Sequence, residues 1–411
     1  MRRPGEQSKP YHPIGVSRWV IFKPITHAVD STDMGTNAHK TTILVTLMLA
    51  LVVALFAAPA QAASRDPKVK GSGAGFSATE GPSSARTTAT GGALPEFGTQ
   101  FHGMWSSYTD SQRAMVLDVL KANGVTTVRL DVSWAMLSPD GPTWNAAGTQ
   151  KVARVIDMIT DRGLAPMVMI WMTPSWVTGS TDERVAPSSP SELRHWQNFT
   201  QELAARFPQV RDWEIWNEPN SDDFMRGADA TVYAKLLDAA YKGIKSGNPA
   251  ARVIFGGTQY VDTPWIVSAL KAGAQGRYDI MGVHPYMAVG DLPPTSPDTD
   301  GIWRMSHLPT LREAMLKFGD DKPIWFTEFG WRVGSVGTEN GELGVSESTQ
   351  AKYLAETLRL VSTRYSYVTR VFWYRDLADN NSSTSSGYGL VQPNGTPKPA
   401  LSQIPALYSS V

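Results

Sequence analysis

From Leu94 onward, the hydrophobic residues follow two patterns that alternate along the chain. Short continuous apolar runs are typical of parallel strands covered on both faces, whereas apolar positions recurring every three or four residues are typical of amphipathic helices. The short runs predict strands over Gly98–Met104, Thr126–Asp131, Ala165–Trp171, Asp212–Trp216, Arg252–Gly256, Ile280–His284, Pro323–Thr327 and Arg370–Trp373. The periodic segments predict helices over Ser111–Asn123, Thr149–Arg162, Ser191–Arg206, Ala230–Ser246, Pro264–Ala274, Leu308–Phe318 and Ser346–Ser362.

A strand followed by a helix, repeated about eight times without a break, is the order that builds a (β/α)8 TIM barrel. The alternative is a doubly wound open sheet, but no G-x-G-x-x-G motif follows the first predicted strand. The pattern therefore favours an α/β protein with a closed barrel.

The only long apolar run, Thr41–Ala63, lies near the N-terminus. It follows a lysine and ends on Ala60-Gln61-Ala62, an A-x-A pattern typical of a signal cleavage site. Residues 1–63 are therefore predicted to be an N-terminal extension and a secretory signal, with Met34 as a candidate start. An uncleaved signal anchor is the alternative, and in both cases the rest of the chain lies outside the cytoplasm.

Residues 64–93 are rich in Ser, Gly, Thr and Ala and carry almost no large apolar side chain. Such a segment cannot offset its ordering entropy by burial, so it is predicted to be a flexible linker. No stretch of similar composition and length follows, and residues 94–411 are therefore predicted to form a single domain.

Composition excludes several classes of partner. Lys plus Arg equal Asp plus Glu at 38 each, and no basic stripe is present, so neither nucleic acid nor an anionic surface is expected as a partner. Cysteine is absent, and the histidines after the linker are not paired at metal-ligand spacing. No metal and no cofactor is expected.

The ends of the predicted strands share an unusual composition, because aromatic residues gather there with amides, imidazoles and carboxylates. In a barrel of this kind, functional groups lie at the carboxyl ends of the strands. Aromatic faces stack on the C–H faces of sugar rings, while polar groups bind the hydroxyls. A carbohydrate partner is therefore predicted, although packing in the core is the usual role of any single tryptophan.

Two of these strands end on a glutamate. The segment Trp213–Asn220, WEIWNEPN, places Glu218 after a buried strand, and Pro323–Trp331, PIWFTEFGW, does the same with Glu328 three strands later. Cleavage of a glycosidic bond needs one protonated and one ionised carboxyl, about 5–5.5 Å apart when the configuration is retained. Two strand ends across a barrel mouth can meet that distance.

These motifs resemble those of clan A glycoside hydrolases, a superfamily of retaining (β/α)8 enzymes. The similarity extends to VRLDVSW (Val128–Trp134), TPSW (Thr173–Trp176), HPY (His284–Tyr286) and a C-terminal segment, Tyr388–Leu401. It covers about Leu94 to Leu401 and is greatest to family 39-like polysaccharide hydrolases and β-xylosidases, with family 5 cellulase-like proteins as the alternative.

The resemblance assigns catalytic roles to both glutamates: Glu218 as the general acid and base, and Glu328 as the nucleophile. It implies that Asn217 binds the sugar 2-hydroxyl and that Arg129 pairs with Glu328, although Arg129 could equally pair with Asp131 or Glu214. The other substrate-binding residues it suggests are His284, Tyr286, Trp373, Trp134, Trp176, Trp331 and His102.

Glu214 shares strand parity with Glu218, so it is expected to point into the barrel and to need a cationic or hydrogen-bonding partner there. The sequence thus predicts a secreted retaining glycoside hydrolase that acts through a covalent glycosyl-enzyme. The alternative is a catalytically inactive barrel that binds carbohydrate. Sugar, linkage, oligomeric state and endo or exo action are not predicted.

Overall fold

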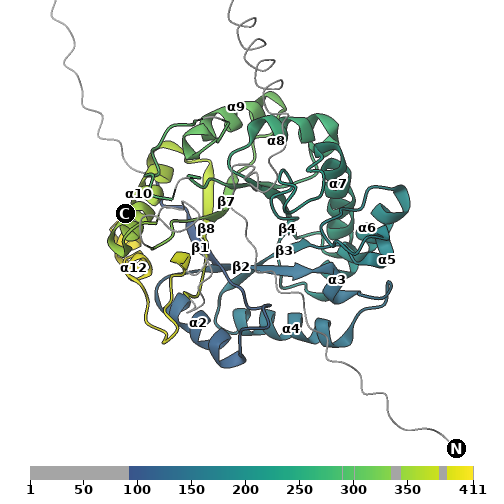
Figure 1. The fold of residues 1–411 in the computed structure, drawn as a ribbon, viewed down its shortest axis with the longest axis horizontal. Helices are drawn as coiled ribbons and strands as arrows, with labels where there is room; N and C mark the ends of the chain where they lie inside the picture. Colours follow the sequence, from purple (N-terminus) through teal and green to yellow (C-terminus); the bar gives the residue numbers. More distant parts are fainter. Residues whose placement is uncertain (1–91, 289, 300, 335–343, 379–386, 411) are drawn as a thin grey trace, which may run out of the picture. The chain divides into compact units, whose positions relative to one another are not determined.

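The computed structural model describes residues 92–288, 290–299, 301–334, 344–378 and 387–410. Eight parallel strands close into a barrel in the order in which they occur in the chain, and helices surround it (Figure 1). The predicted TIM barrel is confirmed. The strands are β1 (Glu96–Gln100), β2 (Thr127–Ser133), β3 (Ala165–Trp171), β4 (Asp212–Ile215), β5 (Arg252–Gln259), β6 (Ile280–His284), β7 (Ile324–Phe329) and β8 (Val368–Trp373).

Long helices follow most strands and cover the outside of the barrel. They are α2 (Asp110–Ala122), α4 (Ala146–Thr160), α6 (Pro190–Arg206), α7 (Ala230–Gly247), α8 (Thr263–Ala269), α9 (Leu308–Lys317) and α10 (Glu347–Arg364). Shorter helical segments are α3 (Trp134–Leu137), α5 (Ser175–Thr178), η2 (Leu270–Ala274), η3 (Met305–His307), α11 (Pro399–Ser402) and α12 (Ile404–Ser409).

Capping residues fix where the long helices begin. Thr109 and Gln112 form a capping box at α2, and Ser189 and Glu192 form another at α6, so that side chains satisfy backbone N–H groups that have no partner inside the helix. Because α2 and α6 each follow a strand in the chain, their caps fix the far ends of the connections that leave the carboxyl ends of β1 and β3.

The core has two parts. Met167, Ile254, Ile280, Trp325 and Phe372 form a small cluster contributed by five different strands. The second, larger cluster joins residues of the strands to the apolar faces of the helices. Side chains alternate in direction along each strand, so neighbours such as Phe372 and Trp373 belong to different clusters.

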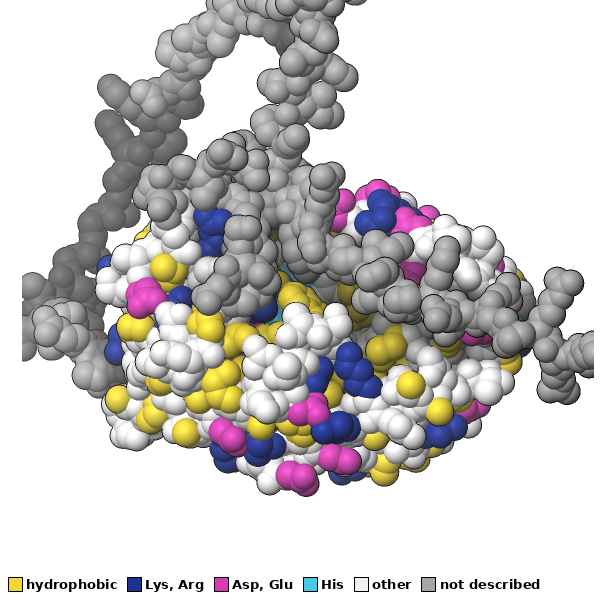
Figure 2. Space-filling view, turned by 60° about the horizontal axis from the view of Figure 1, so that its bottom comes forward, with side chains coloured by type: hydrophobic (Ala, Val, Ile, Leu, Met, Phe, Trp, Pro, Cys, Tyr) yellow, Lys and Arg dark blue, Asp and Glu magenta, His cyan; other side chains and the backbone are white. Residues whose placement is uncertain are grey.

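The N-terminal predictions lie outside the described residues: the extension and signal at residues 1–63, and nearly all of the linker at residues 64–93. Within the ranges that the structure describes, no helix has both the length and the apolar character needed to span a membrane. Lys and Arg side chains are interspersed with Asp and Glu on the visible face of the barrel (Figure 2), as expected for a chain of zero net charge.

Candidate active site

A sharp turn after β4 directs Glu218 into the barrel mouth. Trp216 has φ 71° and Glu218 has φ 40°, both in the left-handed region that residues other than glycine rarely adopt. The turn is held by the Trp216 indole N–H, which donates to the Phe224 carbonyl at 3.0 Å, and by the Glu218 N–H, which donates to the Gly257 carbonyl at 3.0 Å. Backbone strain of this kind occurs where the surroundings enforce a functional geometry.

Glycine is required at position 257 because other groups of the site approach it closely. A Cβ there would lie 2.2 Å from Nε2 of His284 and 2.4 Å from Oγ1 of Thr327. The bare backbone of Gly257 therefore leaves the space in which His284 reaches Glu218.

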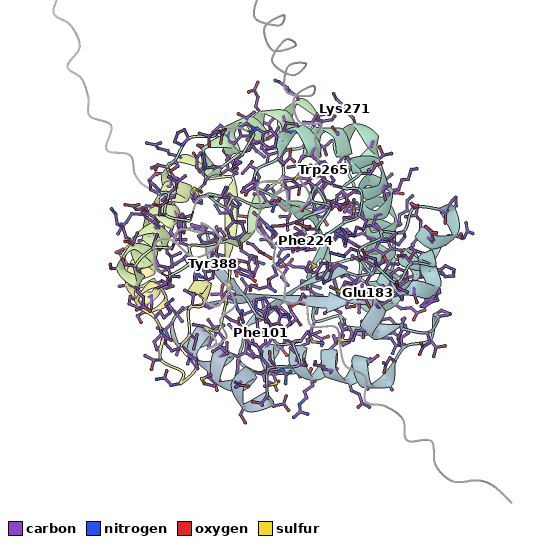
Figure 3. All side chains as sticks on the ribbon, viewed as in Figure 1. Phe101, Glu183, Phe224, Trp265, Lys271 and Tyr388 are labelled. Atoms are coloured by element: carbon purple, nitrogen blue, oxygen red, sulfur yellow. The ribbon has the colours of Figure 1, made fainter. Side chains whose placement is uncertain are left out.

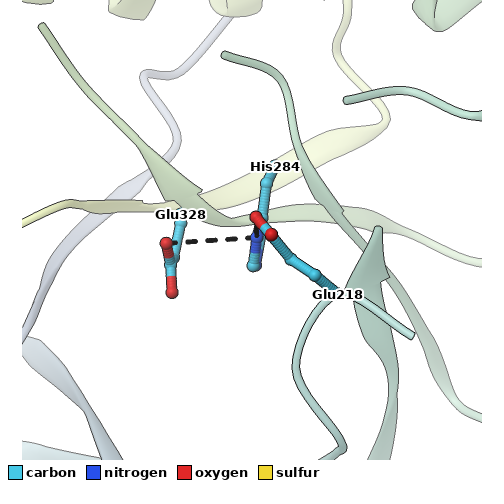
Figure 4. A group of neighbouring side chains, drawn as sticks. All are labelled: Glu218, His284 and Glu328. Atoms are coloured by element: carbon cyan, nitrogen blue, oxygen red, sulfur yellow. Dashed lines mark hydrogen bonds and ion pairs between the residues drawn. The ribbon is translucent and has the colours of Figure 1, made fainter. Parts of the chain in front are cut away.

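The two predicted catalytic carboxyls lie in one cluster. Glu218, His284 and Glu328 are all buried, and each offers one oxygen or nitrogen atom within 4.8 Å of the others (Figure 4). Retaining glycosidases hold their two carboxyl groups about 5–5.5 Å apart, so that one can attack the anomeric carbon directly. One oxygen of Glu218 lies within 4.8 Å of one oxygen of Glu328, which is compatible with that arrangement.

Arg129 connects the floor of the site. Its guanidinium donates to Oε1 of Glu328 at 2.5 Å, to Oε2 of Glu214 at 2.6 Å, to Oδ1 of Asn217 at 2.9 Å and to Oε1 of Gln100 at 2.8 Å. The predicted pairing with Glu328 is present, and so is the alternative with Glu214. The second oxygen of Glu214 accepts from the Gly257 N–H at 3.0 Å, so this fully buried acid has the partners that its burial requires.

The surroundings separate the pKa values of the two carboxyls. Burial, together with the charge of Glu328, raises the pKa of Glu218 well above its ordinary value. Burial also raises the pKa of Glu328, but there Arg129 and the hydrogen bond from Tyr286 act in the opposite direction. These surroundings favour the proton on Glu218 over Glu328, the direction that a general acid and a nucleophile require.

His284 connects Glu218 to β7. Its Nδ1 lies 2.9 Å from Oε1 of Glu218, and its Nε2 lies 3.1 Å from Oγ1 of Thr327. Burial and the charge of Arg129 lower the pKa of His284 well below its ordinary value, so the ring is neutral. If the Thr327 hydroxyl donates to Nε2, then Nδ1–H donates to Oε1 of Glu218, and the acidic proton resides on Oε2.

Two further predicted residues contact this network. The Tyr286 hydroxyl donates to Oε2 of Glu328 at 3.1 Å, so the two oxygens of Glu328 are held by different donors. Asn217 uses Oδ1 to accept from Arg129, while its amide nitrogen has no hydrogen-bond partner within the described part of the chain. That N–H group is available to a substrate hydroxyl.

The structure does not bring the predicted tryptophans together at the mouth. Trp373 is fully buried, donates its indole N–H to the Tyr388 carbonyl at 2.8 Å, and packs between Phe329 and Trp331. Trp373 follows Phe372, which faces the barrel interior, so it has the opposite parity and points toward the helices. The substrate-binding role predicted for Trp373 therefore does not agree with its position in the structure.

The other tryptophans have similar structural surroundings. Trp134 is buried and stacks on Phe199 of α6, at a centroid distance of 5.1 Å. Trp331 is 2% exposed and donates to the Leu292 carbonyl. Trp176 is half-buried and donates to the Ser138 carbonyl at 2.7 Å. Trp134 and Trp331 are thus packing residues in this structure, whereas Trp176 keeps a partly open ring.

Further aromatic residues lie near the mouth, and no substrate-binding role was predicted for them from the sequence. Tyr374 lies close enough to Glu328 for that charge to raise its pKa, after the larger effect of burial. Burial and the charge of Glu218 raise the pKa of Tyr260 to about 12. Trp171 lies at the end of β3 with Phe224 at a centroid distance of 6.3 Å, and Phe224 projects over the middle of the barrel (Figure 3). Strand parity could have identified Tyr374, because it lies two residues after Phe372, which faces the barrel interior.

Glu218, His284 and Glu328 are spaced closely enough to hold a metal ion. Arg129 already supplies a positive charge to Glu328, and both ring nitrogens of His284 have partners. These contacts fit acid–base chemistry better than metal ligation.

Replacing Arg129 with glutamine is expected to remove the counter-charge of two buried carboxylates. Losing one partner of a buried ion pair costs about 3–5 kcal/mol, which urea unfolding would measure. The pKa of Glu328 should rise as well, so the acidic limb of the kcat/KM profile should move to higher pH. Lys242→Gln, which breaks an exposed pair with Asp238, is the control and should change neither quantity appreciably. An unchanged acidic limb in a folded Arg129→Gln variant would contradict the role of Arg129.

A closed (β/α)8 barrel with two buried, unequal carboxyls at the carboxyl ends of β4 and β7 defines the class of clan A glycoside hydrolase barrels. Residues 139–408 match the model of the glycosyl hydrolases family 39, so the chain belongs to that family. The alternative of a family 5 protein is thereby set aside.

Two curated proteins named β-xylosidases are similar to this chain. The chain is 24% identical over 268 residues to a β-xylosidase of Caldicellulosiruptor saccharolyticus, an alignment covering 60% of this chain and 53% of the relative. It is 21% identical over 280 residues to a β-xylosidase of Geobacillus stearothermophilus, covering 61% of this chain and 54% of the relative. The chain thus spans about half the length of these relatives.

Solved structures share the fold. A family 39 glycoside hydrolase from Bacteroides cellulosilyticus superposes with a TM-score of 0.60 at 21% identity, over 77% of this chain and 64% of that one. A GH5_18 protein from Streptomyces cattleya reaches 0.59 at 15% identity, over 77% of this chain and 80% of that one. Both families therefore use the barrel described here.

Proposed function

We propose that the protein is a retaining glycoside hydrolase that cleaves O-glycosidic bonds by double displacement. The observation that carries the proposal is the Glu218–Glu328 pair, two buried carboxyls within one cluster whose surroundings favour a proton on one and a charge on the other. Membership of family 39 supports it.

In the first step, an oxygen of Glu328 attacks the anomeric carbon of the bound sugar. The C–O bond to the leaving group breaks, and Glu218 donates its proton to the departing oxygen. The product is a glycosyl ester on Glu328 with inverted configuration. The amide of Asn217 is placed to donate to a hydroxyl of that sugar, an interaction that can strengthen as charge develops in the transition state.

In the second step, Glu218 is ionised and removes a proton from water, which attacks the same carbon and releases Glu328. The second inversion restores the original configuration. His284 takes part without changing its charge, because its lowered pKa keeps it neutral while Glu218 gains and loses a proton.

β-Xylosides are the first substrates to test, because the two curated relatives are named β-xylosidases. A panel of aryl glycosides and polysaccharides should include them together with mannosides and glucosides. ¹H NMR should show that the first product formed has the same anomeric configuration as the substrate. A first product of the opposite configuration would contradict double displacement. Inactivity on every glycan would favour a barrel that only binds carbohydrate.

We further propose that the barrel acts outside the cytoplasm, exported by the signal predicted in residues 1–63. The Ala60-Gln61-Ala62 pattern supports this proposal. Mass spectrometry of the protein from the culture medium should find a mature N-terminus near Ala63. A protein that keeps residues 1–63 and stays in the cytoplasm would contradict export.

Thr327→Val is expected to lower activity while leaving the fold intact, because valine has the shape of threonine but cannot donate to Nε2 of His284. The ring would no longer be held with its proton toward Glu218. A loss of about 10-fold in kcat corresponds to one lost hydrogen bond. Activity equal to the wild type would show that the Thr327 hydroxyl does not decide which nitrogen of His284 carries the proton.

A further inference from the structure

A second buried polar cluster joins the ends of β1 and β8, beside the two glutamates. His102 follows β1, and Asp376 follows β8. Oδ1 of Asp376 lies 3.1 Å from Nδ1 of His102, while Oδ2 accepts from the His102 backbone N–H at 3.2 Å and from the Tyr108 hydroxyl at 3.0 Å. The carboxylate therefore holds both the backbone and the ring of His102.

Asp376 is poorly placed to bind substrate itself. It is completely buried, and both of its oxygens are occupied by His102 and Tyr108. Burial opposes its ionisation, but the hydrogen bond from His102 and the charge of Arg375 outweigh burial and lower the pKa of Asp376. An ionised, fully engaged carboxylate acts through the residue that it holds.

The Nε2 side of the His102 ring keeps slight solvent access in a residue that is 3% exposed. Nε2 has no hydrogen-bond partner among the described residues, and it is not one of the fully buried polar atoms that lack a partner. The ring lies against Trp105 at a centroid distance of 4.0 Å and against Tyr374 at 5.6 Å. Tyr374 in turn lies close enough to Glu328 for the charge of that carboxyl to raise its pKa, after the larger effect of burial, so the His102 ring lies on the Glu328 side of the mouth.

We propose that Asp376 is a positioning residue, which holds His102 with its proton on Nδ1 and its Nε2 directed at a hydroxyl of the sugar that reacts with Glu328. The inference rests on the proposed glycosidase function. It assigns to Asp376 an indirect role in substrate recognition, and it makes Nε2 of His102 a hydrogen-bond acceptor for the substrate.

The chemistry follows from the hydrogen bonds to the carboxylate. A carboxylate only accepts, so in the neutral imidazole the proton resides on Nδ1 and Nε2 accepts a hydrogen bond from a sugar hydroxyl. Asparagine would have to turn its carbonyl oxygen toward the two donors at Oδ2, the His102 N–H and the Tyr108 hydroxyl. Its NH₂ group would then donate to Nδ1, and the ring proton would move to Nε2.

Asp376→Asn should therefore weaken one specific contact with the substrate. We expect kcat/KM on the best aryl glycoside to fall by about 10- to 100-fold, the size of a lost or reversed hydrogen bond. The same variant should then be assayed on glycosides that lack one ring hydroxyl in turn. For the substrate without the contacted hydroxyl, wild type and variant should agree within about threefold, because the contact is absent from both.

Tyr108→Phe is the matched control, because it removes one hydrogen bond from the same carboxylate and leaves the proton of His102 on Nδ1. It should lower the melting temperature yet keep the wild-type response to each missing hydroxyl. ¹⁵N NMR of histidine-labelled protein, assigned with His102→Gln, should find the proton on Nδ1 in the wild type and on Nε2 in Asp376→Asn.

The outcomes separate this inference from the proposed function. An active wild type for which Asp376→Asn reduces every substrate by one common factor would overturn the positioning role, as would an unchanged His102 tautomer. A wild type inactive on all glycosides would instead remove the proposed function, while the NMR result would still test how Asp376 holds His102.

Discussion

Replacing Glu328 with alanine is expected to lower kcat on an activated aryl glycoside by about 10⁵-fold, the scale of losing a catalytic nucleophile. Among the described carboxyls, Glu214 also contacts Arg129, but Arg129 and Gly257 engage both of its oxygens, so it is not free to replace Glu328. In the proposed mechanism, Glu218 acts on the side of the leaving group. The residual rate should come from binding alone.

Azide should restore part of the activity of Glu328→Ala. The small anion can occupy the space vacated by the carboxylate and attack the anomeric carbon in one step, so the product should be a glycosyl azide of inverted configuration. Glu313→Ala, which removes an exposed carboxylate on α9, is the control and should behave as the wild type. A glycosyl azide of retained configuration would show that Glu328 is not the nucleophile.

Replacing Glu218 with alanine is expected to lower kcat/KM, which reports the first step, by an amount that depends on the leaving group. Substrates with a poor leaving group need the proton and should lose about 10²–10⁴-fold, the usual contribution of general acid catalysis. Dinitrophenyl glycosides need no proton to depart, so their first step should be little affected. A uniform loss across a series of leaving groups would contradict the assignment.

The pH dependence of the same variant provides a second readout. Glu218 must be protonated at the start of the reaction, so its raised pKa should set the basic limb of the wild-type profile, and activity should fall as the pH rises through it. The basic limb should disappear in Glu218→Ala. If the limb persists, a different group donates the proton.

Much of the fold could be predicted from the sequence, because its main signal is periodicity. β3 and β6 have the predicted bounds; β4, β5 and β8 differ by a few residues at one end, and β1, β2 and β7 differ at both ends. The exact ends of strands and helices depend on pairing with neighbouring strands and on helix caps, which the sequence of a single element does not reveal. The helix predicted over Pro264–Ala274 becomes α8 followed by the π-helical turn η2, with Gly273 at φ 112°. The short helices after β2 and β3 carry too few residues for a period.

The catalytic part of the site could be predicted because each residue stands at a strand end within a recognisable motif. Arg129 and Tyr286 donate hydrogen bonds to Glu328, and His284 is hydrogen-bonded to Glu218. The Nδ1 atom of His284 lies 4.0 Å from Oε2 of Glu328, which brings the two groups together. The aromatic wall could not be predicted in the same way, because a tryptophan at a strand end serves packing and stacking equally well.

Parity and long-range pairing account for the rest. Trp373 and Tyr374 are neighbours in the sequence, and only the inward direction of Phe372 shows that Tyr374 is the one that faces the mouth. The contact between His102 and Asp376 joins residues 274 positions apart. No local pattern records such a pairing, whereas closure of the barrel between β1 and β8 produces it directly.

Trapping the covalent intermediate tests the central claim most directly. An activated 2-deoxy-2-fluoro glycoside of the sugar preferred in the aryl panel should inactivate the enzyme and add one glycosyl mass. Peptide mapping should then find the sugar on Glu328, with Glu218 unmodified. A sugar attached to any other residue, or rapid turnover of the wild type on the parent glycoside with inversion and no adduct, would contradict a double displacement at Glu328.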